Sequence, residues 1–180
     1  MAFRLRTAHT ADLTPAVLRS VRAFLDAAFD GGFGDDDWDH SLGGMHALVH
    51  DGSGLAAHGS VVMRRTRLDG RWLRTGYVEA VAVRADVRRT GLGGRVTAAL
   101  EGIVDRAYDL GALSASEQGA ALYAARGWHR WDGRVHALSP DGIVRLPDEE
   151  GSLHLRPAPA ARPLDPRGEL VLDWRDGDVA

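Results

Sequence analysis

The stretch GYVEAVAVRADVRRTGLGGR, from Gly76 to Arg95, decides how this chain folds. Its first half is rich in valine and contains a tyrosine, which is typical of a buried strand. Its second half contains Arg88-x-x-Gly91-x-Gly93 and precedes a run with apolar residues at helical spacing. Glycines directly before a helix let backbone N–H groups converge on one point, where the positive end of the helix dipole adds to them. The stretch therefore predicts a strand, a phosphate-binding turn and a helix, and with them a phosphorylated cofactor.

Two common phosphate loops fit this turn badly. A Walker A loop needs a lysine, and the chain contains none. A Rossmann fingerprint needs a third glycine where Val96 stands, and it would not follow two arginines in mid-chain. An ordinary surface turn before a helix remains the structural alternative.

Length and composition narrow the class of protein. The chain has 180 residues, 44% of them hydrophobic, which predicts one globular domain over 1–180. It has no cysteine and no lysine, which excludes disulfides, thiolate metal sites and Schiff-base chemistry. The net charge of −3 argues against a nucleic-acid partner. Without a signal peptide or a long apolar run, the sequence predicts a cytoplasmic protein with no membrane contact.

The pattern of residues predicts an α+β fold with helices on a mostly antiparallel sheet. Thr14-Pro15 marks the start of a helix that runs to about Phe29, and Asp69-Gly70 indicates a two-residue hairpin. Residues 30–44 are expected to form a loop, and the proline-rich residues 156–166 a crossing loop. Further helices are expected from about 92 and over 118–126, and strands over 3–9, 45–51, 55–68, 76–83, 112–114, 128–131, 135–138, 153–155 and 170–174.

Two motifs resemble the GNAT superfamily of N-acetyltransferases. The first is Arg-x-x-Gly-x-Gly after a strand that carries a glutamate, and the second is Leu122-Tyr123-x-x-x-Gly127-Trp128. The resemblance implies a GNAT fold with acetyl-CoA as cosubstrate. It implies that strand and loop residues bind this cofactor, namely Val81, Ala82, Val83, Arg88, Arg89, Thr90, Gly91, Leu92 and Gly93.

A narrower resemblance, to the aminoglycoside 2'-N-acetyltransferases, runs from about residue 9 to the C-terminus. It rests on Asp37-Trp38-x-His40, Leu42-Gly43-Gly44-Met45-His46, Gly76-Tyr77-Val78-Glu79, Leu110-Gly111-Ala112-Leu113-Ser114 and Asp173-Trp174-Arg175-x-Gly177-Asp178. The resemblance implies acetylation of an aminoglycoside antibiotic, hence resistance, by a homodimer. It implies substrate contacts by Asp37, Glu79, Ala80, Ser114, Glu149 and Asp178.

The distribution of acids agrees with a polycationic substrate. Acidic residues gather in three clusters, over 30–39, 148–150 and 173–178. If the clusters converge, they attract ammonium groups and bind them through charge-assisted hydrogen bonds. Taken singly, each cluster is better explained as a solvated loop.

Acetyl transfer to an amine needs a base, an oxyanion donor and an acid. Glu79 is the candidate base, the backbone N–H of Val81 the candidate oxyanion donor, and Tyr123 the candidate acid for the sulfur. The alternatives are an ion pair between Glu79 and Arg84 or Arg74, and a core position for Tyr123.

The histidines do not predict a metal site. His46 and His50 have the i, i+4 spacing of a helical metal pair, but they lie in a predicted strand, where that spacing exceeds about 12 Å. We therefore expect no metal.

Two other functions stay open. One is acetylation of a different amine, such as a kasugamycin-type aminoglycoside, a polyamine, a protein N-terminus or an aminoacyl-tRNA, although acidic clusters disfavour tRNA. The other is a catalytically silent acyl-CoA-binding module, which the presence of both Glu79 and Tyr123 disfavours. Acetylation of a different amine is suggested by three departures from the pattern of the family that the chain resembles. That pattern has aspartate at the positions of Gly32 and Glu149, and tryptophan at the position of Ala180.

Overall fold

The computed structural model describes residues 2–159, 165 and 167–180. Its internal contacts divide the chain into two compact units. The first unit contains the residues up to Val62 together with Val78–Ile103, and the second contains Met63–Tyr77 and the residues from Val104 onward. The strands β3 (Gly54–Leu68) and β4 (Arg71–Val83) each contribute residues to both units.

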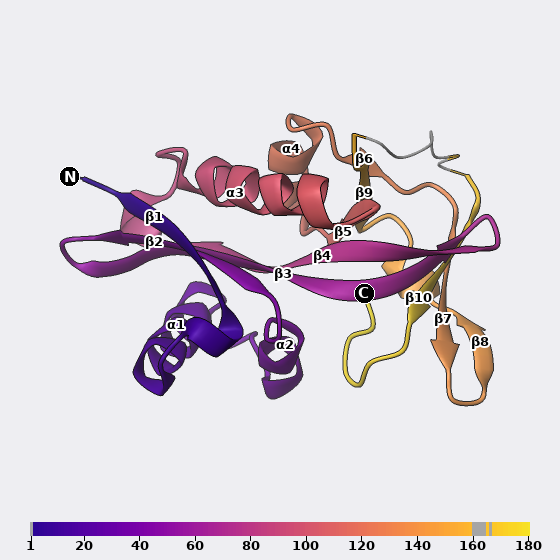
Figure 1. Ribbon diagram of the computed structural model, residues 1–180, viewed down its shortest axis with the longest axis horizontal. Helices are drawn as coiled ribbons and strands as arrows, with labels where there is room; N and C mark the ends of the chain where they lie inside the picture. The colour runs from indigo at the N-terminus through magenta and orange to yellow at the C-terminus, as the bar shows by residue number, and fades with distance from the viewer. Residues whose placement is uncertain (1, 160–164, 166) are drawn as a thin grey trace. The chain divides into compact units, whose positions relative to one another are not determined.

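In the first unit, helices lie on both faces of a short antiparallel sheet (Figure 1). The helices α1 and α2 lie on one face and α3 lies on the other. Gly59 makes the packing of α3 possible, because a Cβ there would lie 2.7 Å from Val96 and 3.1 Å from Leu100. The remaining bounds in this unit are β1 (Arg4–His9), η1 (Thr10–Asp12), α1 (Pro15–Ala28), α2 (Asp35–His40), β2 (Met45–Asp51), η2 (Ala85–Val87) and α3, which runs over Leu92–Ala107 and ends in the second unit.

The sequence accounts for the position of α1. The Thr14 hydroxyl accepts a hydrogen bond from the N–H of Val17 at 3.3 Å, and Pro15 occupies the first helical position, as predicted. Val21 and Leu25 are fully buried on the inner face of the helix. They belong to a hydrophobic core cluster with Leu13, Phe33, Leu48 and Ala82.

The second unit contains the longer series of strands, in the order β6-β9-β5-β4-β3-β10-β7-β8. Its β3–β4 turn is the predicted hairpin, with φ of 49° at Asp69 and 76° at Gly70, which is the pattern of a type I′ turn. The bounds are β5 (Leu110–Ser114), α4 (Glu117–Ala124), β6 (His129–Arg130), β7 (Arg134–Ser139), β8 (Gly142–Arg145), η3 (Pro147–Glu149), β9 (Leu153–Pro157) and β10 (Glu169–Asp173).

The predicted α+β class is confirmed, with a sheet that is mixed in detail. β5 runs parallel to β4, and β10 runs parallel to β7. The other pairings, such as β1 with β2 and β5 with β9, are antiparallel. None of the helices in the described ranges is long and apolar enough to cross a membrane.

Two local predictions were wrong. Residues 30–44 are not entirely loop, because Asp35–His40 forms α2. Acidic residues in a first helical turn favour a helix, since they face its positive end. The strand β8 was missed, because Gly142–Arg145 is short and largely exposed and so lacks a buried apolar pattern. The crossing loop predicted over 156–166 lies partly outside the described residues, and its first two residues belong to β9.

Candidate active site

The predicted phosphate-binding turn has the backbone conformation that such a turn needs. Gly91 has φ of 86°, and Arg89 has φ of 62°, a left-handed value that is uncommon for a residue with a side chain. The N–H of Arg95 donates to the carbonyl oxygen of Gly91 at 3.1 Å, so α3 begins directly after the turn. The first N–H groups of a helix lack intrahelical partners, and left-handed residues beside them form concave anion sites. The turn can therefore hold a phosphate group.

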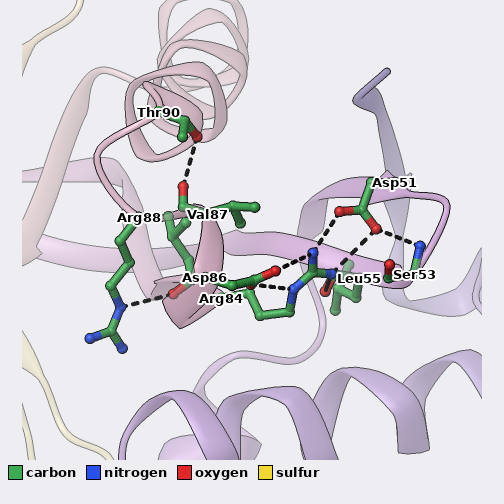
Figure 2. A network of polar contacts seen from close by, with 9 residues as sticks. Asp51, Ser53, Leu55, Arg84, Asp86, Val87, Arg88 and Thr90 are labelled. Atoms are coloured by element: carbon green, nitrogen blue, oxygen red, sulfur yellow. Dashed lines mark hydrogen bonds and ion pairs between the residues drawn. The ribbon is translucent and has the colours of Figure 1, made fainter. Parts of the chain in front are cut away.

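An arginine at the end of β4 fixes the start of this turn (Figure 2). Nη2 of Arg84 lies 2.6 Å from Oδ2 of Asp51, and its Nε lies 2.7 Å from Oδ1 of Asp86. Arg84 also donates to the carbonyl oxygen of Leu55 at 3.2 Å. Hydrogen bonding to Arg84 lowers the pKa of both Asp51 and Asp86. The network ties the turn between β2 and β3 to the end of β4.

Two more side chains hold the turn itself (Figure 2). Nε of Arg88 donates to the carbonyl oxygen of Val83 at 3.2 Å, and its Nη2 donates to that of Ala28 at 3.3 Å. The Thr90 hydroxyl donates to the carbonyl oxygen of Val87 at 2.7 Å. These side chains bind backbone carbonyls of the first unit, so the turn is preorganised by its own residues.

The strand β4 is irregular at Ala80, whose φ is 49°. A left-handed alanine within a strand is strained, and it changes the direction of the residues on each side. These neighbours are Glu79 and Val81, both half-buried. The candidate base and the candidate oxyanion donor therefore flank one irregular residue.

The ion pairs considered as the alternative role of Glu79 are made with other acids. Arg84 binds Asp51 and Asp86, as described above. Arg74 binds Asp109, with Nη2 to Oδ1 at 3.2 Å and its own N–H donating to Oδ2 at 2.9 Å. Each of these two arginines therefore has a carboxylate partner of its own.

In the second unit, Tyr123 lies in an aromatic environment on α4. Its side chain is 7% exposed, and its ring centroid lies 6.0 Å from that of Trp128 and 6.5 Å from that of His154. Burial raises the pKa of Tyr123 to about 12, so its hydroxyl keeps its proton. Ser114 at the end of β5 is exposed and pairs with Leu153, the residue before His154. The structure thus places Ser114 and Tyr123 beside the same short segment of β9.

Two of the acidic clusters meet in the second unit. Glu149 and Asp178 form a side-chain hydrogen bond. Burial, then this hydrogen bond and the charge of Asp178, raise the pKa of Glu149 to about 7. Arg175 opposes the shift only in part. The carboxyl group of Glu149 therefore gains its negative charge near neutral pH.

Asp37 belongs to the first unit and has a structural contact. Its Oδ2 accepts a hydrogen bond of 2.7 Å from the N–H of Gly34, at the start of α2. This contact orients the carboxylate.

A curated aminoglycoside 2'-N-acetyltransferase from Mycolicibacterium fortuitum is 45% identical to this chain over 176 residues. The match covers 97% of this chain and 90% of that protein. The chain belongs to the aminoglycoside 2'-N-acetyltransferase family. No protein-family model matches the chain.

Solved structures confirm the predicted GNAT fold. Escherichia coli YhbS, a GNAT family N-acetyltransferase in complex with CoA, has a TM-score of 0.63 at 14% identity, over 97% of this chain and 90% of that one. Escherichia coli ElaA has a TM-score of 0.60 at 17% identity, over 86% of this chain and 99% of that one. At such identities the likeness concerns the fold alone.

Sequence reasoning missed two buried residues of this aminoglycoside 2'-N-acetyltransferase family member. Nδ1 of His58, on β3, donates a hydrogen bond of 2.9 Å to the carbonyl oxygen of Ala80. Arg64, also on β3, binds Asp173 and Val179. Neither residue belongs to a local motif. The contact of His58 depends on strand register, and the contacts of Arg64 are with residues more than 100 positions away.

Proposed function

We propose that this protein transfers the acetyl group of acetyl-CoA to the 2'-amine of an aminoglycoside, and so confers antibiotic resistance. The observation that carries the proposal is the 45% identity, over nearly the whole chain, to an aminoglycoside 2'-N-acetyltransferase. The preorganised turn before α3 and the carboxyl pair of the second unit support it.

The proposal assigns acetyl-CoA to the first unit's strand and turn. The backbone N–H groups of Arg88–Gly93 would bind the pyrophosphate, aided by the positive end of α3. The backbone of Val81–Val83 would bind the pantetheine arm as an added strand would. The left-handed φ at Arg89 and Gly91 supports this assignment, because it lets successive N–H groups point to one side.

The proposed chemistry uses three groups. Glu79 takes a proton from the 2'-ammonium, directly or through water, which leaves a neutral nitrogen to attack the thioester carbon. The N–H of Val81 donates to the carbonyl oxygen as it becomes negative. The C–S bond then breaks, Tyr123 gives its proton to the departing thiolate, and the proton that the attacking nitrogen loses in becoming an amide restores the tyrosine. A tyrosine whose pKa is raised to about 12 carries that proton at neutral pH.

Carboxylates and small groups would bind the remainder of the antibiotic. The proposed substrate residues are Asp37, Glu79, Ala80, Ser114, Glu149 and Asp178. Ammonium groups form charge-assisted hydrogen bonds with carboxylates, so several acids suit a polyamine better than a neutral sugar. We further propose that the chain acts as a single functional domain, in a homodimer, in the cytoplasm where acetyl-CoA is available.

The test is turnover with a matched pair of antibiotics. Tobramycin carries an amine at the 2' position and kanamycin A a hydroxyl, so release of free thiol from acetyl-CoA is expected with tobramycin alone. Mass spectrometry and NMR of the product would locate one acetyl group at the 2' nitrogen. Equal turnover of both antibiotics would indicate acetylation at another amine. If calorimetry shows that acetyl-CoA binds, but neither these antibiotics nor other amines are acetylated, the protein would be the silent acyl-CoA-binding module.

A further inference from the structure

Two buried histidines form a chain of hydrogen bonds that ends at the irregular residue of the cofactor strand. Nδ1 of His58 lies 2.9 Å from the carbonyl oxygen of Ala80, and Nε2 of His58 lies 2.9 Å from Nδ1 of His46. Nε2 of His46 lies 2.8 Å from the hydroxyl oxygen of Thr10. Both histidine side chains are fully buried. None of the proposed chemical steps uses either ring.

The strand register brings the two rings together. His58 is paired with Leu48, and His46 is paired with Ser60, so the histidines are diagonal neighbours across β2 and β3. Residues two apart on a strand share a face, which puts both rings on the face that carries Leu48. Leu48 belongs to the core cluster that α1 covers. The chain of hydrogen bonds therefore lies in the protein interior.

The final acceptor fixes the direction of every hydrogen bond in the chain. A carbonyl oxygen only accepts, so His58 must carry its hydrogen on Nδ1 and accept at Nε2. His46 must then donate from Nδ1 and accept at Nε2 from the Thr10 hydroxyl, which itself accepts from the N–H of Gly43 at 2.9 Å. The single hydrogen of that hydroxyl goes to His46 at 2.8 Å, because the competing carbonyl oxygen of Gly44 is farther away, at 3.2 Å, and already accepts from the N–H of Thr10 at 2.9 Å. Burial lowers the pKa of His46 to about 4 and that of His58 to about 3, so both rings are neutral. One tautomer of each ring satisfies the whole chain.

The contact with Ala80 has a direct consequence for its neighbours. A left-handed alanine is strained and persists only where surrounding groups hold it. His58 holds it by binding its carbonyl oxygen, which a regular strand residue would direct to a neighbouring strand. The same peptide group, Ala80–Val81, contains the N–H of Val81. Fixing the carbonyl of Ala80 therefore fixes the direction of that N–H, because the peptide is planar.

We propose that His58 is a positioning residue for acetyl transfer, which orients the Ala80–Val81 peptide through its Nδ1–H while His46 and Thr10 hold its ring. This role rests on the proposed function, because it concerns the oxyanion donor of that reaction. His58 itself contacts neither substrate.

Two substitutions separate the hydrogen bond from simple packing. His58→Asn keeps a donor near the Nδ1 position but leaves a larger void, whereas His58→Gln fills the space better but puts its amide near the Nε2 position. We expect His58→Gln to lower kcat by roughly ten- to a hundredfold with little change in KM, as misplacement of a reacting group does. We expect His58→Asn to keep kcat within about threefold of the wild type, although its melting temperature falls further. His136→Gln, at a half-buried histidine of β7 whose Nδ1 has no hydrogen-bond partner, is the matched control and should change neither quantity.

If His58 acts only by packing, His58→Gln should retain a higher kcat than His58→Asn, because glutamine fills more of the space. A kcat of His58→Asn below that of His58→Gln, or an unchanged kcat in His58→Gln, would therefore overturn the proposal. NMR of the wild-type protein with ¹⁵N-labelled histidine gives a second readout that depends on no variant. It should show the neutral Nδ1–H tautomer at His58, and an Nε2–H tautomer would also overturn the proposal. The NMR measurement needs no substrate, so it tests the hydrogen bond of His58 even if the enzyme is inactive. A wild-type protein that acetylates no aminoglycoside would contradict the proposed function and leave this hydrogen bond untouched.

Discussion

Arg64 donates a hydrogen bond of 2.6 Å from Nη1 to the carbonyl oxygen of Val179, 115 residues further along the chain. Its Nε and Nη2 donate to Oδ1 and to the carbonyl oxygen of Asp173, each at 2.8 Å. The guanidinium also lies 4.7 Å from the ring centroid of Tyr77. One buried side chain on β3 thus anchors the segment after β10, which carries the proposed substrate acid Asp178.

We predict that Arg64→Met raises the KM for the aminoglycoside by about tenfold and leaves acetyl-CoA affinity unchanged. The substitution also removes the hydrogen bonds to the carbonyl oxygens of Val179 and Asp173, while Oδ2 of Asp173 keeps the N–H of Arg65, so the free energy of unfolding should fall by roughly 2 kcal/mol. Steady-state kinetics, calorimetry and urea unfolding measure these effects. Arg67→Met is the matched control on the same strand, because its ion pair with Glu169 is long, at 3.4 Å, and mostly exposed. Equal KM values for the aminoglycoside in the two variants would show that Arg64 has no part in substrate binding.

We predict that Glu149→Gln stabilises the protein increasingly as the pH rises from about 4.5 to about 7, with the full gain above that range. The pKa of Glu149 is raised in the folded protein, from an ordinary 4.5 to about 7, so folding favours the protonated acid. Its contribution to stability is therefore complete below about pH 4.5 and is lost as pH rises to about 7. Glutamine resembles the protonated form at every pH. The melting temperature of the variant should exceed that of the wild type at pH 8 and match it near pH 4.5.

Asp141→Asn provides the control for the Glu149 prediction, since Asp141 is an exposed acid that is not among the charges shifting the pKa of Glu149. The same melting series for this control should run parallel to the wild type. A Glu149→Gln variant with no gain at pH 8 would show that folding does not raise the pKa of Glu149.

We predict that Gly91→Val weakens acetyl-CoA binding strongly. A Cβ at Gly91 meets no atom within 4 Å, so the fold has room for it, but a β-branched residue is disfavoured at φ of 86°. The side chain would also stand where backbone N–H groups approach phosphate. Gly127→Val is the control, because Gly127 has nearly the same φ, 82°, and an equally open Cβ position after α4. Calorimetry that finds equal acetyl-CoA affinity in the two variants would place the pyrophosphate elsewhere.

We predict that Glu79→Gln lowers kcat by roughly ten- to a thousandfold with little change in acetyl-CoA affinity, because an amide cannot accept the ammonium proton. The acidic limb of the pH–rate profile should change with it. Glu169→Gln, an exposed glutamate on β10, serves as the control. A Glu79→Gln variant with an unchanged pH–rate profile would remove Glu79 from the mechanism.

The sequence predicted the fold where local chemistry decides it. The cap at Thr14, the Asp69-Gly70 hairpin and the glycine-marked start of α3 are short-range signals, and each is confirmed. The helix over Asp35–His40 was missed, because a run of aspartates also reads as a solvated loop. β8 was missed because an exposed edge strand has no buried pattern to detect.

Prediction of the site was less complete for the same reason. The turn before α3 is encoded by consecutive residues, so its conformation could be predicted. The meeting of Glu149 with Asp178 depends on how the segments around η3 and β10 pack, and only the family resemblance suggested it. The contact of His58 with Ala80 depends on the pairing of β2, β3 and β4 and on an irregular φ, neither of which has a signal in a single sequence.

The last prediction concerns Gly32, where the family pattern has an aspartate. A charge-assisted hydrogen bond contributes about 1.5–3 kcal/mol, so its absence should weaken a polyamine substrate by roughly ten- to a hundredfold. We therefore expect the wild type to acetylate tobramycin and gentamicin with high KM and to favour an aminoglycoside with fewer amines, such as kasugamycin. Gly32 is exposed, and a Cβ there would lie 3.2 Å from the carbonyl oxygen of Phe29, a contact that a small shift relieves. Gly32→Asp should lower the KM for tobramycin by at least about tenfold, and Gly32→Asn, equal in size but uncharged, should not. Micromolar KM values for tobramycin in the wild type, without improvement in Gly32→Asp, would show that this position has no part in specificity.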